Sequence, residues 1–172
     1  MTETIPYEVT GKTGEIEIRK YPALVLATVD SAGDDSGFNL LFAYITGKNV
    51  AKNTLQMTAP VITPAKIPMT SPVVSDASTM SFVMPAGKTR DEIPEPLDIK
   101  VRIVPVLERE VGVITFRGRT GEKEVRAAEE LLLKGLRDAG IETAGEVFLM
   151  RYNPPWIPGF LRRNEVGIAI KR

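Results

Sequence analysis

Hydrophobic and polar residues alternate with a period of two in four segments of the chain, and this alternation predicts β-strands. The clearest segments are 16–18, 111–115, 147–151 and 166–170, each bounded by glycine, proline or charged residues. Weaker signals of the same kind lie at 24–29, 55–62, 80–84 and 99–104. The pattern therefore predicts about eight strands.

Prolines recur every four residues from the end of the 55–62 segment onward, at Pro60, Pro64, Pro68 and Pro72. A helix cannot form there, because each ring would clash with a backbone carbonyl one turn back. We expect an edge strand that leads into a loop. Two further proline clusters, near 85–96 and 154–158, are interpreted as loops inside a single domain that spans residues 1–172.

Two helices are predicted, at 36–46 and 121–139. The longer one has Thr120 as the expected N-cap and Gly140 as the residue after its C-terminus. Its opposite side is charged, and its apolar stripe has helical spacing. The stripe consists of Val125, Ala128, Leu132, Leu136 and Ala139.

The predicted elements follow the order β-α-β-β twice, with the first unit over residues 16–84 and the second over 111–171. A duplicated unit of this kind favours an α+β fold, in which two helices pack on one curved, mostly antiparallel sheet or open barrel.

The first helix is apolar on both sides. Phe38, Leu41, Phe42 and Ile45 form the expected core face, and the opposite side carries Leu40, Ala43, Tyr44 and Gly47. An exposed apolar face beside a tyrosine indicates a ligand groove or a protein contact. The alternative is that a loop, either 64–72 or 153–163, covers this face.

Cationic residues follow the first helix, at Lys48 and Lys52, and precede the last strand, at Arg162 and Arg163. Such charges suit an apolar ligand that carries carboxylates. Ordinary solvated surface charge is the alternative for each of them taken alone.

The amino-acid composition excludes several kinds of partner, active site and metal site. The 172 residues include 22 basic and 22 acidic ones and neither histidine nor cysteine. The balanced charge argues against a nucleic-acid partner. The missing histidine and cysteine exclude the usual nucleophile relays, thiol redox cycles and nearly all zinc or iron-sulfur sites. No segment is apolar enough for a signal peptide or a membrane span, so a cytoplasmic protein is expected.

Seven short segments, in order along the chain, resemble the SOUL family of haem-binding proteins. They are YEV at 7–9 with IEIRKY at 16–21, FNLLFAYITGKN at 38–49, MTAPV at 57–61, SFVMP at 81–85, and YNPP at 152–155 with RNEV at 163–166. The resemblance implies a distorted, eight-stranded β-barrel built from the duplicated unit, similar to gyrase-inhibitor-like effector domains. It also implies a non-catalytic haem or tetrapyrrole carrier or buffer.

The family binds its ligand in a hydrophobic groove beside the first helix and the loop before the final strand. Carried over to this chain, the resemblance implies a binding set of Leu40, Ala43, Tyr44, Lys48, Met57, Arg162 and Arg163. Some vertebrate members are proposed to ligate iron through a histidine, which this chain lacks. The other possible iron ligands are Met57, Met69, Met84, Tyr44 and Lys48, although methionines near strands are usually core residues. Weak binding without a defined axial ligand is therefore expected.

Three other functions stay open. A cleft between the halves could bind amphipathic or cationic molecules at Glu146 or Glu165, although each acid is better interpreted as the structural partner of Arg151 or Arg163. An enzyme with a carboxylate general base has no supporting motif. Finally, the apolar helix face could join copies of the chain, so a monomer or a weak homo-oligomer is expected.

Overall fold

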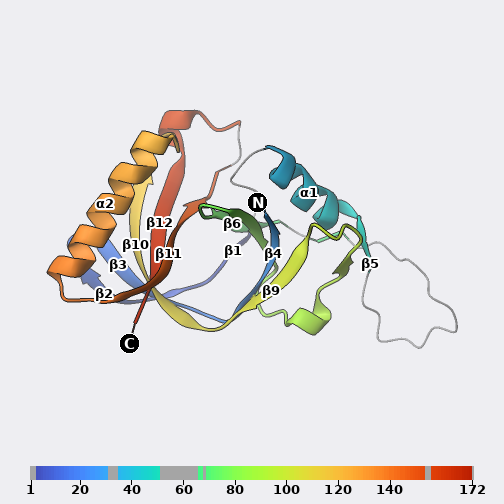
Figure 1. The fold of residues 1–172 in the computed structure, drawn as a ribbon, viewed down its shortest axis with the longest axis horizontal. Helices are drawn as coiled ribbons and strands as arrows, with labels where there is room; N and C mark the ends of the chain where they lie inside the picture. Colours follow the sequence, from blue (N-terminus) through green and yellow to red (C-terminus); the bar gives the residue numbers. More distant parts are fainter. Residues whose placement is uncertain (1–2, 31–34, 51–65, 68, 154–155, 172) are drawn as a thin grey trace, which may run out of the picture.

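The computed structural model describes residues 3–30, 35–50, 66–67, 69–153 and 156–171, and its two long helices lie on one strongly curled sheet (Figure 1). The predicted strand at 55–62 and Met57 fall outside the described residues. The helices are α1 (Asp35–Thr46) and α2 (Glu122–Asp138), both where the sequence predicts them. The α+β fold is therefore confirmed.

The main sheet runs in the order β2-β3-β10-β12-β11-β6-β7-β4-β9, and every neighbouring pair along this path is antiparallel. The strands are β2 (Glu8–Thr13), β3 (Ile16–Tyr21), β4 (Leu24–Asp30), β6 (Thr70–Ser75), β7 (Thr79–Val83), β9 (Arg102–Val106), β10 (Arg109–Arg117), β11 (Thr143–Arg151) and β12 (Arg163–Ile170). A short β1 (Glu3–Thr4) adds to β6 in parallel, and β5 (Asn49–Val50) pairs with β8 (Glu95–Pro96). Two short 3-10 helices, η1 (Arg90–Glu92) and η2 (Gly159–Leu161), lie in the connections.

The β-α-β-β repeat is visible in the sheet order. The units β4-α1-β6-β7 and β10-α2-β11-β12 are arranged alike and meet where β6 pairs with β11. The strand signals at 16–18 and 24–29 correspond to two strands, β3 and β4, and only β4 belongs to the first unit. Each unit is flanked in the sheet by a strand that precedes the other unit in the chain: β3 pairs with β10, and β9 pairs with β4.

The edge strand and loop predicted across the proline-rich stretch lie mostly outside the described residues. The end of that stretch, Pro72, belongs to β6, which is not an edge strand. It lies between β11 and β7. Pro72 fits inside the sheet because the register with β7 shifts between Thr70 and Val73, so the ladder requires no N–H from the proline.

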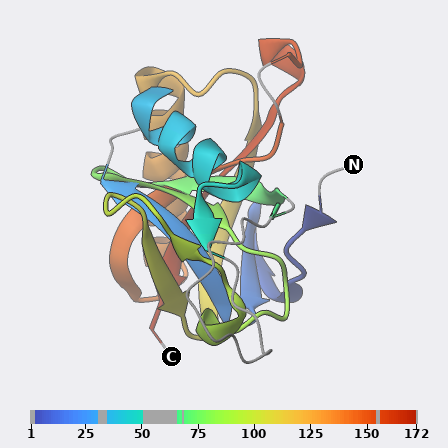
Figure 2. The same cartoon turned by 90° about the vertical axis from the view of Figure 1, so that its right-hand side faces the viewer.

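The helices cover the outer, convex side of the sheet, with α1 against β4 and β7 and α2 against β10 and β12 (Figures 1 and 2). One hydrophobic cluster lies under each helix. A third cluster fills the inner face, the side of the sheet opposite the helices. Its buried members are Ile5, Tyr21, Val83, Val111, Val113 and Met150.

Helix α2 buries the middle of its predicted stripe at Ala128, Leu132 and Leu136, whereas Ala139 is exposed. Gly140 adopts φ of 72°, the left-handed conformation expected after a helix C-terminus. The N-cap is Gly121 and not Thr120, and no side chain caps this end.

Candidate functional site

Helix α1 is rotated relative to the orientation that the sequence analysis assigns to it. Leu41 and Ile45 are buried as predicted, but Tyr44 is buried with them and only 1% exposed. Its hydroxyl donates a hydrogen bond to the backbone carbonyl of Pro94, and burial raises the pKa of this phenol. The prediction that Tyr44 lies on an exposed face is therefore wrong, since the helix turns it toward the chain around Pro94.

The apolar side chain that α1 exposes is Phe42, at 48%, so the prediction that Phe42 lies on the core face is wrong. It lies about 200° around the helix from Tyr44. Its ring stacks on Phe38 with 6.1 Å between centroids, and Phe38 meets the ring of Phe82 edge-on at 5.3 Å. Leu40 and Ala43 are half-buried, so their accessible surface is smaller than the sequence suggests.

A second exposed apolar set lies in the connection between β11 and β12. Trp156 is 80% exposed, Phe160 75% and Leu161 52%. Both views place this connection and α1 at the same end of the molecule (Figures 1 and 2). Trp156 is the sole tryptophan of the chain, so its fluorescence reports on this segment alone.

Of the cationic residues named by the sequence, Lys52 lies outside the described residues, and the other three have different partners. Lys48 is exposed at the end of α1, 3.7 Å from Asp98. The Nε of Arg162 donates to the carbonyl of Ile157 at 2.9 Å. Arg163 instead joins the acid of β12: its guanidinium lies 3.0 Å from Glu165 and 4.7 Å from the Tyr152 ring centroid. The structure therefore does not bring Arg162 and Arg163 together as one pair.

Glu165 is the centre of a buried polar cluster. Its carboxylate is 0% exposed and accepts two hydrogen bonds from Arg19, at 2.7 and 2.6 Å. Thr115 donates to it at 2.9 Å, and the Tyr152 hydroxyl donates as well. The guanidinium of Arg19 lies 4.0 Å over the ring of Tyr7. The prediction of a structural pair with Arg163 is confirmed, but Arg19 is the main partner.

Burial by itself would raise the pKa of Glu165, but the hydrogen bonds from Arg19 and Tyr152 and the charges of Arg19 and Arg163 outweigh it and hold this pKa at about 2. The acid is therefore ionised and fully engaged by the chain's own donors. This argues against Glu165 as a general base or as the receptor of a cationic ligand. Glu146 is exposed beside the bulge in β11, away from any such cluster.

Sequence reasoning missed the role of Arg19, although a signal for it exists. In β3 the apolar residues Ile16 and Ile18 alternate with Glu17, Arg19 and Tyr21. A strand with one polar face predicts solvent on that side. Because the sheet curls, the polar face of β3 is enclosed, and Arg19 is 1% exposed.

Arg151, expected beside Glu146, lies elsewhere. Among the residues that the structure describes, its side chain has no hydrogen-bonding or ionic partner, and its Nε is buried. Burial lowers the pKa of this guanidinium, and no nearby carboxylate compensates within the described ranges.

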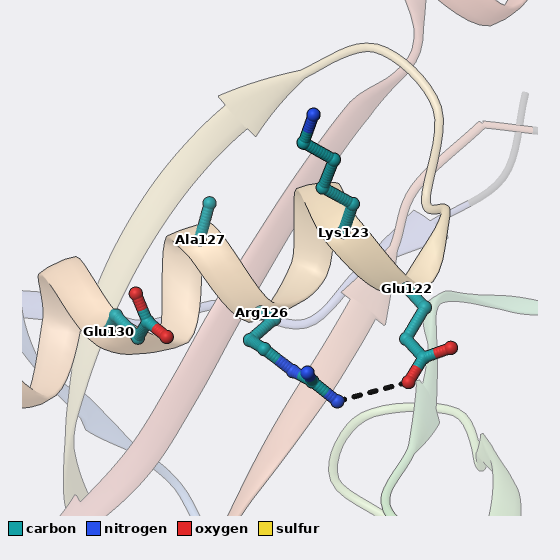
Figure 3. Close-up of a pocket in the computed structure, with 5 residues that line it drawn as sticks. All are labelled: Glu122, Lys123, Arg126, Ala127 and Glu130. Atoms are coloured by element: carbon teal, nitrogen blue, oxygen red, sulfur yellow. Dashed lines mark hydrogen bonds and ion pairs between the residues drawn. The ribbon is translucent and has the colours of Figure 1, made fainter.

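An open hollow on the solvent side of α2 is lined by charged residues that project in different directions (Figure 3). Its one pair joins Arg126 and Glu122 at 3.0 Å, and both side chains are largely exposed. Such a surface pair contributes little to stability or binding. Across the described part of the chain there is no group of three or more potential metal ligands, and no helix is long and apolar enough to cross a membrane.

Residues 2–169 match the model of the SOUL heme-binding protein family. The chain belongs to this family. Two curated proteins of similar sequence support this assignment. Human Heme-binding protein 2 is 32% identical over 173 residues, which cover 96% of this chain and 83% of that protein. Mouse Heme-binding protein 2 is 30% identical over 183 residues, covering 96% and 87%.

Solved structures share the SOUL-family fold at low identity. A hydrolase from Listeria innocua gives a TM-score of 0.55 at 12% identity and covers 94% of both chains. The C-terminal domain of EcmrR gives a TM-score of 0.55 at 8% identity, and the match covers 96% of this chain and 98% of that domain. The structure of SAV2435 bound to tetraphenylphosphonium gives a TM-score of 0.51 at 10% identity, and the match covers 92% of this chain and 94% of that chain. Identities this low establish the fold and no activity.

Proposed function

We propose that this SOUL-family chain is a non-catalytic binding protein that holds haem or a related tetrapyrrole against the exposed apolar side chains of α1 and of the β11–β12 connection. The observation that carries the proposal is the exposure of Phe42 on α1 and of Trp156 and Phe160 in the β11–β12 connection, in a protein whose family binds haem. Flat aromatic rings suit a macrocycle, which gains from stacking and from removal of apolar area from water.

Half-buried Leu40 and Ala43 extend this apolar surface, and Lys48 and Arg162 supply cations at its margins. Tyr44 supports it from below as a core residue and does not contact the ligand. Arg163 forms an ion pair with Glu165, so we leave it out of the binding set.

The donor set of the described residues does not favour iron ligation. Met84 is 1% exposed, and Tyr44 is buried with its hydroxyl bonded to Pro94. Met69 is half-buried and packs against the cluster under α1. We therefore assign the affinity to the macrocycle and its carboxylates, and binding does not depend on the iron.

The test is a titration of the purified protein with haemin and with iron-free protoporphyrin IX, followed by absorbance and by quenching of Trp156. Saturable one-to-one binding of both is expected, with affinities within about threefold, because apolar contact supplies most of the free energy. Phe42→Asp and Phe160→Asp should each weaken binding at least tenfold, which corresponds to about 1.4 kcal/mol.

Leu107→Asp is the matched control, because Leu107 is 85% exposed but lies between β9 and β10. Its binding should equal that of the wild type. Equal weakening by all three variants, or no saturable binding by the wild type, would overturn the proposal. Binding of haemin alone would show instead that iron ligation carries the affinity.

A further inference from the structure

Arg151 lies at the end of β11, on the outer face of the sheet between the two helix-covered clusters. Side chains alternate along a strand, and Met150 belongs to the inner cluster, so Arg151 points outward with Leu149. Leu149 packs against the cluster under α2. The residue opposite Arg151 on β6 is Val73, which packs against the cluster under α1. The guanidinium is therefore a cation beside two apolar clusters.

Arg151 is half-buried, and its Nε is a buried donor without a hydrogen-bond partner among the described residues. A buried N–H donor is normally paired, because leaving it unsatisfied away from water is costly. Arg19 shows the usual arrangement, with a carboxylate, a tyrosine hydroxyl and a ring around it. Arg151 has none of these among the described residues, and its Nε is shielded from water. Asn164, opposite it on β12, donates instead to the carbonyl of Gly118.

The chain order adds a second reason to expect a ligand here. Arg151 directly precedes the β11–β12 connection that carries the exposed Trp156 and Phe160. A ligand lying on those rings extends its polar end toward one end of this connection or the other. At the far end, Arg162 is held by a backbone carbonyl and Arg163 by Glu165. Of these three arginines, Arg151 is the one without a hydrogen-bonding or ionic partner among the described residues.

We infer that Arg151 is the anion anchor of the ligand site, and that its donors take a carboxylate of an amphipathic, flat ligand such as a tetrapyrrole propionate. This inference rests on the proposed function and deepens it by naming the charged group that the site selects. A charge-assisted, bidentate pair in a partly desolvated position is among the stronger polar contacts in proteins. The site therefore prefers carboxylate-bearing macrocycles to their esters.

The experiment compares protoporphyrin IX with its dimethyl ester, which has the same ring and no ionised carboxylate. The wild type should bind the free acid at least tenfold more tightly than the ester, as measured by quenching of Trp156. Arg151→Gln should lose this preference by weakening the acid about tenfold and leaving the ester unchanged. Arg151→Lys should keep part of the preference, because it keeps the charge without the bidentate geometry.

Arg126→Gln is the matched control, since Arg126 is an exposed arginine on α2. Unchanged selectivity in Arg151→Gln, with the control also unchanged, would overturn the inference and leave the proposed function standing. If the wild type binds neither porphyrin, the proposed function fails, and a second arm still tests Arg151. That arm measures the Tm in sulfate against chloride at equal ionic strength. A sulfate-dependent gain that Arg151→Gln removes supports the anion site, and equal gains in both proteins overturn it.

Discussion

At the scale of single residues, the buried pair of Arg19 and Glu165 is the main electrostatic feature of the inner face. The two side chains come from β3 and β12, with β10 between them. Taking one partner away leaves a buried charge without compensation, which typically costs 3–5 kcal/mol. The sequence singles out Glu165 as a candidate but not Arg19 as its partner, because Arg19 occupies a polar position of an alternating strand whose enclosure depends on the curl of the sheet.

The lowered pKa of Glu165 makes stability depend on acid pH. Its pKa of about 2 in the folded protein lies below the ordinary glutamate pKa of 4.5, so the unfolded chain binds the proton more tightly. The stabilisation is therefore complete above pH 4.5 and is lost as pH falls toward 2, amounting to roughly 3 kcal/mol. Urea unfolding of the wild type at pH 7, 5, 4 and 3 should show this loss. Asp76, Glu92 and Asp138, whose pKa values are also lowered, contribute in the same direction.

Glu165→Gln isolates the contribution of the one acid, because it retains the other three. This variant should be less stable than the wild type at pH 7 and should lose less stability between pH 5 and 3. Parallel pH profiles for the two proteins would show that Glu165 titrates normally in the folded state.

At the scale of elements, α2 follows its sequence pattern closely, whereas α1 does not. A helix with one apolar and one charged side has a single orientation that buries its apolar stripe, and α2 adopts it with Leu132 and Leu136 inward. Helix α1 is apolar nearly all round, so hydrophobicity cannot fix its rotation. Tertiary contacts decide instead: the hydrogen bond from Tyr44 to Pro94 and the packing of Phe38 on Phe82 turn Phe42 outward.

Two neighbouring leucines of α2 test this orientation. Leu132 is 0% exposed and Leu131 is 58% exposed. Leu132→Ala should lower the free energy of unfolding by about 2–5 kcal/mol, because it leaves a cavity in the cluster under α2. Leu131→Ala changes the same residue type in the same helix and should cost about 0.5 kcal/mol or less. Urea unfolding measures both, and similar losses would place the helix in a different rotation.

At the scale of the whole molecule, the exchange of β3 and β9 ties the two halves into one unit. Neither half contains all the strands of its own section of the sheet, and β6 pairs with β11 across the middle. The inner cluster also draws on both halves, with Val83 from one and Val113 from the other. Such mutual dependence favours a single cooperative transition.

Hydrogen exchange can detect this cooperativity. The Leu132→Ala variant removes core contacts under α2. In this variant the free energy of exchange of the slowest amides should fall by the same amount in β4 and β7 as in β10 and β12. The wild type gives the reference protection for each strand. If only β10 and β12 lose protection, the halves unfold independently and the exchanged strands do not couple them.

The sequence alone determined the class of the fold, the two helices, most of the described strands and the family. Those features depend on local periodicity, on caps and prolines, and on short motifs that lie together along the chain. Only the tertiary structure decided which face of α1 is exposed, that Pro72 lies inside the sheet, and that Arg19 and not Arg163 is the main partner of Glu165. The structure also shows that Arg151 does not form the predicted pair with Glu146. These outcomes depend on the curl of the sheet and on pairings between residues far apart in sequence, which a pattern along one chain does not encode.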